Sequence, residues 1–322
     1  MTEGGLATLD MARRYFRLFV NRAAYTVQSH KPDTGGKYYY YRPKGQQRLG
    51  FDTIIKHLNG EITIGLYAIN PRTQRSKWVA IDADYDAAFE HLVKLQWELR
   101  KDGVHSALER SRRGAHLWLF AAAPLLASNC RLYIYNFARR LHIPIKVAGK
   151  TEGIEVFPRQ DKLGADEFGN AIRGPLGVHR GAGGKRFWFY GADFKFEPQL
   201  TYLERLTKIT EDQMRGLVTG LTMPEDFLPK PSVALPPYNP NRPEFRILDH
   251  VPRGRRSGRD YRTRCPSCAQ LGRDKNNTHL AVCISDPRKY RCWAGCTKEE
   301  IRAAVGCPIR QLTESRVWQM NR

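Results

Sequence analysis

Two closely spaced pairs of cysteines near the C-terminus constrain the fold of this chain more than any other feature. Cys265-Pro-Ser-Cys268 and Cys292-Trp-Ala-Gly-Cys296 are separated by 23 residues. Each short spacing lets a turn direct two sulfurs towards one point, and four thiolates in a tetrahedral set suit a zinc ion. Because four sulfur ligands leave no open position, we expect one structural zinc ion rather than a catalytic one.

The residues between and after the two pairs predict the rest of a zinc ribbon. We expect two short strands at 280–284 and 289–291, and Thr297-x-x-Glu300 has the form of a capping box that begins a helix. His279 is an alternative ligand that could replace one cysteine. The other three cysteines suit small core positions: Cys130, Cys283 and Cys307.

Composition excludes several classes of protein. The 322 residues include 53 Lys+Arg and 32 Asp+Glu, a net charge of +21, and 11% aromatic residues exclude a chain disordered throughout. The longest apolar stretch, Leu117–Leu126, is interrupted by Pro124 and is far shorter than the roughly 20 residues needed to cross a bilayer. The sequence begins without the pattern of a signal peptide. We therefore expect a cytoplasmic protein, away from membranes, that attracts nucleic acid.

The positive charge is concentrated in one segment. Residues 251–264 contain six arginines and one acid. This composition is compatible with a solvated linker, but the neighbouring zinc site favours contact with phosphates. The candidate nucleic-acid contacts are Arg253, Arg255, Arg256 and Arg259.

Prolines divide the chain into parts. Residues 1–225 alternate apolar runs with helical patterns, as in a domain that mixes helices and strands. Seven prolines between 224 and 243 predict an extended tether, because proline lacks an amide donor and fixes φ. We therefore expect a catalytic domain at 1–225, a Pro/Arg-rich linker at 226–258 and a zinc-binding module at 259–322.

A buried strand over 78–84 is central to the first domain. The expected elements that follow are a helix with Phe89, Leu92, Val93 and Trp97 on one face, strands at 104–109 and 116–120, a helix capped by Ser128, and strands at 154–157, 171–176 and 187–190.

The strand over 78–84 ends in two carboxylates, Asp82 and Asp84. Alternation along a strand puts both on one face, about two residue rises apart. Two close acids repel unless a divalent cation neutralises them, and Mg²⁺ or Mn²⁺ prefers oxygen ligands of this kind. The alternative is a strand that runs into an acidic turn, since Asp86 follows.

Polar residues interrupt later apolar runs in the same way. The stretch 111–116 places a serine, two arginines and a histidine at the start of a strand, although that histidine alone would suit a hydrogen-bonded core position. Glu155 is a third acid, and Arg173 and His179 flank a Pro/Gly turn followed by Lys185. Such a set matches nucleotidyl transfer, in which carboxylates hold two metal ions and cations hold a triphosphate.

This ordered set resembles the archaeo-eukaryotic primase (AEP) superfamily, and in particular the primase-polymerases of mobile elements and conflict systems. The likeness covers roughly residues 12–200. The matching motifs are Asp82-x-Asp84, the stretch from Ser111 to His116, and a later strand acid, Glu155. A zinc ribbon of this kind is appended to many primases.

The resemblance implies an α+β fold, with an RRM-like catalytic sheet and an N-terminal α/β unit. It implies a DNA primase-polymerase that makes and extends primers on single-stranded DNA, with Asp82, Asp84 and Glu155 binding two Mg²⁺ or Mn²⁺ ions. Asp161 or Glu152 could take the place of Glu155. The residues implied to contact the incoming nucleoside triphosphate are Ser111, Arg113, His116, Arg173, His179 and Lys185, with His116 also counted as catalytic.

Two other functions are compatible with these residues. A metal-dependent nuclease would share the acids without needing the triphosphate-binding set. A non-catalytic zinc-ribbon protein would bind nucleic acid through the zinc module, by phosphate charge and by stacking on Trp293 or Tyr261. The sequence contains no Walker-type loop, so any replicative helicase partner would be a separate chain.

Overall fold

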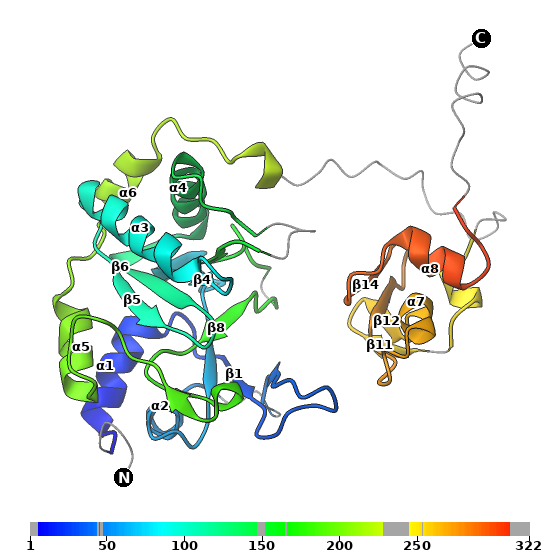
Figure 1. The fold of residues 1–322 in the computed structure, drawn as a ribbon, viewed down its shortest axis with the longest axis horizontal. Coiled ribbons are helices and arrows are strands. Elements are labelled where there is room, and N and C mark those ends of the chain that lie inside the picture. The colour runs from blue at the N-terminus through cyan, green and yellow to red at the C-terminus, as the bar shows by residue number, and fades with distance from the viewer. Residues whose placement is uncertain are drawn as a thin grey trace. The chain divides into compact units, whose positions relative to one another are not determined.

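A computed structural model describes residues 6–43, 45, 48–146, 152–164, 166–227, 245–252 and 254–309. The chain divides into two compact units, Met1–Pro229 and Lys230–Arg322 (Figure 1). None of the helices in the described ranges has the length and apolar character needed to span a bilayer.

An antiparallel sheet of order β5-β6-β4-β7 forms the centre of the first unit. Alternate residues of its longest strands enter different cores: Trp78 and Trp118 face one, and Ile81 and Leu117 face the other. Helices α3 and α4 cover the second face (Figure 1). The elements are β4 Arg75–Ala83, α3 Ala88–Lys101, β5 Ala107–Arg110, β6 Ala115–Leu126, α4 Ala127–Arg140 and β7 Glu155–Phe157.

A second antiparallel sheet, of order β2-β1-β3-β8, lies on the other side of the first core. Helix α1 begins at a Thr8 cap and buries Tyr15 and Phe19 in this core. The elements are α1 Leu9–Phe19, β1 Tyr25–Gln28, β2 Tyr40–Tyr41, α2 Phe51–Leu58, β3 Ile64–Tyr67 and β8 Ala171–Arg173.

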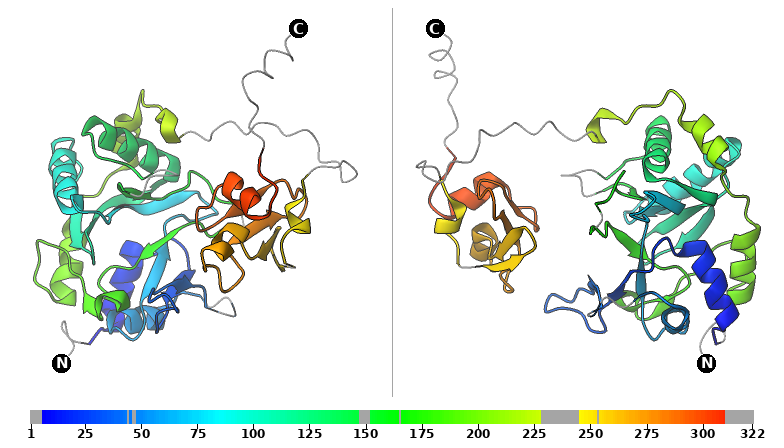
Figure 2. Two further views of the ribbon diagram at one scale, coloured as in Figure 1. Left: turned by 45° about the vertical axis from the view of Figure 1, so that its right-hand side comes forward. Right: turned by 180° about the vertical axis from the view of Figure 1, so that it is seen from behind.

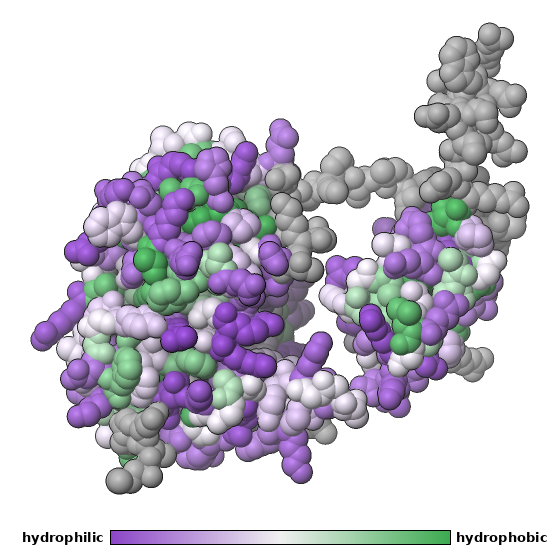
Figure 3. Space-filling view, viewed as in Figure 1, coloured by the Kyte–Doolittle hydropathy of each residue, from purple (hydrophilic) through white to green (hydrophobic). Residues whose placement is uncertain are grey.

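The remaining elements of the first unit follow β8. Helix α5 lies beside α1, and Arg14 of α1 pairs with Glu197 and Glu204 of α5 (Figure 2). The surface in Figure 3 is largely hydrophilic, with small apolar patches. The elements are the hairpin β9 Val178–His179 and β10 Lys185–Arg186, the 3-10 helix η2 Arg180–Ala182, α5 Phe196–Arg205, α6 Glu211–Val218 and the 3-10 helix η3 Glu225–Phe227.

The second unit is built on an antiparallel sheet of order β11-β12-β13-β14. The predicted capping box is present, because Thr297 and Glu300 each accept a hydrogen bond from the backbone amide of the other. The elements are the 3-10 helix η4 Ile247–Asp249, β11 Arg255–Ser257, β12 Asp260–Thr263, α7 Pro266–Gln270, β13 Leu280–Cys283, β14 Tyr290–Cys292 and α8 Lys298–Ala304. The mixed fold with antiparallel sheets and a C-terminal four-cysteine group is therefore as the sequence predicts.

Three local expectations are corrected. In α3 the residues predicted to share a face are mostly on the solvent side: Trp97 is 64% exposed, and Leu95 and Leu99 are buried instead. Ser128 lies inside α4, because β6 runs directly into the helix and leaves Leu126 at the cap position. The strand expected at 187–190 is reduced to an isolated bridge between Phe189 and Glu109.

The expected linker at 226–258 contains folded residues at its end. Residues 228–244 and Arg253 lie outside the described residues. Ile247 is fully buried in the core of the second unit, and β11 pairs with β12. The residues of β11 are exposed and rich in arginine, so by composition they resemble a solvated linker. The sequence therefore did not show where the tether ends.

Candidate active site and metal centre

Four polar side chains lie in one row across the central sheet. Glu109 on β5 pairs in register with His116 on β6, His116 pairs with Asp82 on β4, and Asp82 pairs with Glu155 on β7. Directly paired residues of antiparallel strands lie on the same face. The neighbouring row, Ala107–Trp118–Ala80–Phe157, is apolar and belongs to the first core. The polar row therefore begins where the apolar core of this face ends.

Glu109 is the most deeply buried member of the row, with 0% of its surface exposed. Its carboxylate accepts hydrogen bonds from His116 Nδ1 at 2.9 Å, Trp118 Nε1 at 3.2 Å and the guanidinium of Arg173 at 2.5 Å. Burial opposes ionisation of Glu109, but the charge of Arg173 and the bond from His116 outweigh it and lower the pKa of the carboxyl. Arg173 is itself only 7% exposed, so it meets this carboxylate inside the protein.

His116 links Glu109 to Asp82. Its Nε2 lies 3.4 Å from Asp82 Oδ1 on the side opposite Glu109. Burial would lower the pKa of His116, but the two carboxylates outweigh burial and raise this pKa to about 9. The imidazole is therefore a cation at neutral pH that donates from Nδ1 to Glu109 and holds its other nitrogen towards Asp82.

Asp82 has the features of a cation ligand. Its Oδ1 is buried, and its one cationic neighbour among the described residues is His116 Nε2 at 3.4 Å, a contact that does not meet hydrogen-bond geometry. A buried carboxylate oxygen needs positive charge or hydrogen-bond donors nearby, and Asp82 shares its one cation, His116, with Glu109. Asp84, just beyond β4, is exposed and lies within 2.6 Å of Arg113 and 3.5 Å of Ser111 Oγ. The chemistry of these oxygens fits Mg²⁺ or Mn²⁺.

Gly114 brings this turn against the end of β4. A Cβ at Gly114 would lie 1.9 Å from the carbonyl oxygen of Ala83, so only glycine allows the approach. Ser111 and Gly114 close the turn, since the Ser111 amide donates to the Gly114 carbonyl and the Gly114 amide donates to Ser111 Oγ. Ser111 and Arg113 thereby come beside Asp84.

Glu155 lies next to Asp82 in register but has its own cations. Lys146 Nζ is 2.6 Å from its Oε1 and Arg159 is 3.1 Å from its Oε2. Asp161 pairs with Arg131, and Glu152 is exposed. Among the described residues, the three predicted acids do not form a group whose ligand atoms lie within 4.8 Å of one another; only the four cysteines do.

The predicted nucleotide-binding residues after β8 lie around the β9–β10 hairpin. Lys185 is exposed and pairs in register with His179. Burial, and then the charge of Arg173, lower the pKa of His179 to about 4, so this ring is neutral at pH 7. Arg180, Lys185 and Arg186 line a cavity of about 410 Å³ at the hairpin. The hairpin therefore presents a basic surface.

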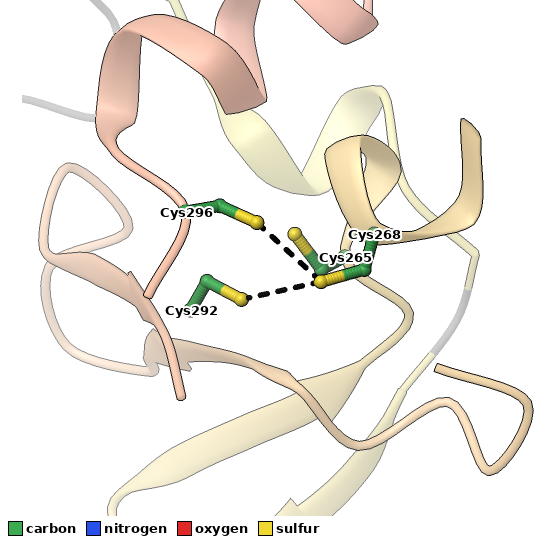
Figure 4. A group of neighbouring side chains, drawn as sticks. All are labelled: Cys265, Cys268, Cys292 and Cys296. Atoms are coloured by element: carbon green, nitrogen blue, oxygen red, sulfur yellow. Dashed lines mark hydrogen bonds between the residues drawn. The ribbon is translucent and has the colours of Figure 1, made fainter. Parts of the chain in front are cut away.

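The four cysteines of the second unit form the group predicted from their spacing (Figure 4). Their sulfurs lie within 4.8 Å of one another, and Cys268 Sγ is 3.6 Å from Cys292 Sγ and 3.4 Å from Cys296 Sγ. All are free thiols. Sulfurs bound to one zinc at about 2.3 Å are about 3.8 Å apart, so the group fits a tetrahedral zinc ion. His279 stands outside this group.

Residues 14–217 match the family described as TOTE conflict system, Archaeo-Eukaryotic Primase domain. The chain belongs to this family. The match covers the polar row, the Ser111–Gly114 turn and the β9–β10 hairpin. The resemblance drawn from the sequence motifs is confirmed.

Two solved structures are similar to this AEP chain. One is the catalytic domain of primase Repb' in complex with initiator DNA, with 9% identity, a TM-score of 0.32, and coverage of 61% of this chain and 93% of that chain. The other is the polymerase domain of Mycobacterium tuberculosis Ligase D in complex with DNA, with 11% identity, a TM-score of 0.29, and coverage of 66% and 87%. No curated protein matches the chain.

Glu109 of this AEP domain was not among the site residues predicted from the sequence. In the sequence, Glu109 is simply the last residue of an apolar strand. A carboxylate two residues after Ala107, on the strand face that enters the core, is nevertheless unusual. Its alternation with Ala107 was the available signal. Its partners, at positions 116, 118 and 173, could not be found without the strand register.

Proposed function

We propose that this AEP protein is a DNA primase-polymerase that makes and extends primers on single-stranded DNA by template-directed, metal-dependent nucleotidyl transfer. The family match supports nucleotidyl transfer as the class of reaction. The observation that carries the proposal is the row Glu109–His116–Asp82–Glu155, in which a buried oxygen of Asp82 without a well-formed hydrogen bond lies next to Glu155 in register. A nuclease would need the acids alone.

Asp82, Asp84 and Glu155 are the proposed ligands of two divalent ions. Bound Mg²⁺ or Mn²⁺ would supply the Lewis acid that activates the primer 3′-hydroxyl and stabilises the departing pyrophosphate. Arg113, Lys146 and Arg159 now neutralise two of these carboxylates and would have to release them. His116 would hold Asp82 in place through its charge.

The triphosphate is proposed to lie against the basic surface of the β9–β10 hairpin. His179 and Lys185 would contact its oxygens, with Ser111 and Arg113 approaching from the turn after β5. Arg173 is proposed to add positive potential from its buried position on Glu109. The cavity of about 410 Å³ at the hairpin, whose lining includes Arg180, Lys185 and Arg186, supports an anionic ligand here.

The test is incubation of the full chain with a single-stranded DNA template, Mn²⁺ or Mg²⁺, and labelled ATP or dATP without a primer, followed by sizing of the products. We expect template-dependent products. The variant D82A/D84A should reduce incorporation by at least about 1000-fold, because removal of the metal ligands removes most electrostatic stabilisation of the transition state.

The matched control is Asp86→Ala, since Asp86 is an exposed acid two residues further along the chain. Its activity should stay within twofold of the parent protein. Full incorporation by D82A/D84A would refute the site. Degradation of labelled DNA in the absence of nucleoside triphosphates would instead support the nuclease, and unchanged DNA binding without either reaction would support a non-catalytic binder.

A further inference from the structure

Three arginines lie in one row across the sheet of the second unit. Arg255 on β11 pairs in register with Arg262 on β12, Arg262 pairs with Ala281 on β13, and Ala281 pairs with Arg291 on β14. Paired residues share a face, so the arginines flank a small alanine on one side of the sheet. Arg255 and Arg262 come from neighbouring strands of one hairpin and Arg291 from a strand further along the chain, and only Arg255 belongs to the predicted contact set.

The opposite face of this sheet is occupied by the core of the unit. Leu280 and Val282, which alternate with Ala281 along β13, are fully buried there with the zinc-binding cysteines. Arg255 and Arg291 are exposed. The arginine row therefore lies on the outer face, away from the metal site.

An aromatic ring continues this face. Trp293 follows Arg291 by two residues and is 54% exposed. The guanidinium carbon of Arg291 lies 3.7 Å from the centre of the indole ring, and that of Arg262 lies 4.8 Å away. Both cation–π contacts hold the indole ring at the surface. So large an apolar ring is usually mostly buried.

The chemistry of this face fits a polyanion that also carries flat apolar groups. Four strands spaced about 4.8 Å apart extend over roughly 14 Å, enough for several successive nucleotides. Unpaired bases can stack on an exposed indole, whereas the bases of a duplex are already stacked on one another. The arginines supply the phosphate contacts.

We propose that the outer face of the β11–β14 sheet binds single-stranded DNA, with Arg255, Arg262 and Arg291 on the phosphates and a base stacked on Trp293. The choice of DNA as the nucleic acid rests on the proposed function. This surface is not the same as the arginine-rich segment 251–264. Arg256 follows Arg255 on the same strand, so its side chain lies on the opposite face of the sheet.

The test measures the affinity of the full-length, zinc-loaded chain for fluorescent oligo(dT) by anisotropy over a range of salt concentrations, without nucleotides or divalent ions. R255A/R291A should weaken binding at least about tenfold and reduce the slope of log K against log salt by about 1.4, since each phosphate contact on a single strand contributes about 0.7. W293A should weaken binding about 5- to 100-fold and leave the slope unchanged.

Two controls remove positive charge elsewhere in the second unit, one matched to the double variant and one to the single variant Arg255→Ala. R273A/K275A removes two exposed cations outside the row and should change the affinity less than twofold. Arg256→Ala should weaken binding less than Arg255→Ala. Zinc stoichiometry of one in every variant verifies that the unit is folded.

Equal losses in R255A/R291A and R273A/K275A would overturn the proposal in favour of general charge attraction. Unchanged affinity in W293A, or equal affinity for duplex and single strands, would overturn the stacking contact. The two proposals can fail separately. If the parent chain binds through this face but makes no DNA, only the polymerase proposal is refuted. If it makes DNA normally and R255A/R291A loses no affinity, only the proposed surface is refuted.

Discussion

At the scale of single residues, Glu109 determines how the charges of the site are held. One buried carboxylate accepts hydrogen bonds from both His116 and Arg173, which come from positions 57 residues apart in the sequence. A buried ion pair contributes little by itself, but removing one partner leaves the other charge uncompensated. Glu109 therefore connects the central sheet to β8 by charge as well as by packing.

We predict that Glu109→Ala destabilises the first unit by about 3–5 kcal/mol, because two buried cations lose their carboxylate. Urea unfolding monitored by tryptophan fluorescence measures this change. Glu109→Gln keeps the shape and one acceptor and should cost less. A loss below about 1 kcal/mol in the alanine variant would contradict the network.

His57 is a second buried group whose ionisation bears on stability. Its Nε2 donates to the carbonyl of Pro175 at 3.1 Å, and its Nδ1 accepts the amide of Ile64 at 3.3 Å. The ring is fully buried, and this burial lowers the pKa of His57 to about 4. The neutral ring therefore ties the turn after β8 to β3.

We predict that stability falls as the pH decreases from about 6.5 to about 4. In this window the unfolded chain binds a proton at His57 that the folded chain does not, so acid favours unfolding, by up to about 3 kcal/mol. His57→Gln removes the titrating group, and the difference in unfolding free energy between parent and variant should shrink towards pH 4. A difference independent of pH would contradict the lowered pKa.

At the scale of elements, periodicity and turn chemistry predicted most of the strands and helices, and contacts between elements explain where prediction failed. The carboxylate strand, the four cysteines and the capping box at Thr297 depend on local sequence, and all three are present. The prediction of the buried face of α3 was wrong. Leu92 belongs to the core while Phe89 and Val93 do not, and only packing against the sheet distinguishes them. Register is equally non-local, so the arginine row of the second unit was not predictable.

The turn between β8 and β9 supplies an element-scale prediction. A Cβ at Gly177 would lie 1.8 Å from the imidazole of His57, so Gly177→Ala must displace the ring or the hairpin that carries His179. We expect a loss of about 2–4 kcal/mol in unfolding free energy and reduced nucleotide affinity.

The same substitution at Gly216 is the control. Gly216 lies in α6, and nothing is within 4 Å of a Cβ there. Because alanine favours the helix over glycine, Gly216→Ala should stabilise the chain by about 0.5–1 kcal/mol. Destabilisation of equal size in both variants would refute a specific clash at Gly177. Urea titration measures both.

At the scale of the whole molecule, the two units have separate cores. Among the described residues of the second unit, eight form its buried core, among them Cys265, Cys268 and Cys292. So small an apolar core cannot offset the entropy of ordering the chain, and we propose that zinc bound by the four cysteines supplies much of the folding free energy. Within the described ranges, the two cores of the first unit share no residue with this cluster.

We therefore predict that Cys268→Ser releases the zinc ion and unfolds the second unit, while the first unit keeps its structure. Cys268 is chosen because it is buried and its sulfur lies 3.6 Å from that of Cys292 and 3.4 Å from that of Cys296. Cys283→Ser is the matched control, since this free thiol on β13 contacts Ser285 outside the group. Metal analysis should give no zinc for Cys268→Ser and one per chain for Cys283→Ser. Amide NMR spectra should lose the dispersed signals of the second unit alone, because the charge network and aromatic core around β4 make no use of the metal. Retained zinc in Cys268→Ser would contradict Cys268 as a ligand, and collapse of both units together would mean that the two cores are not independent.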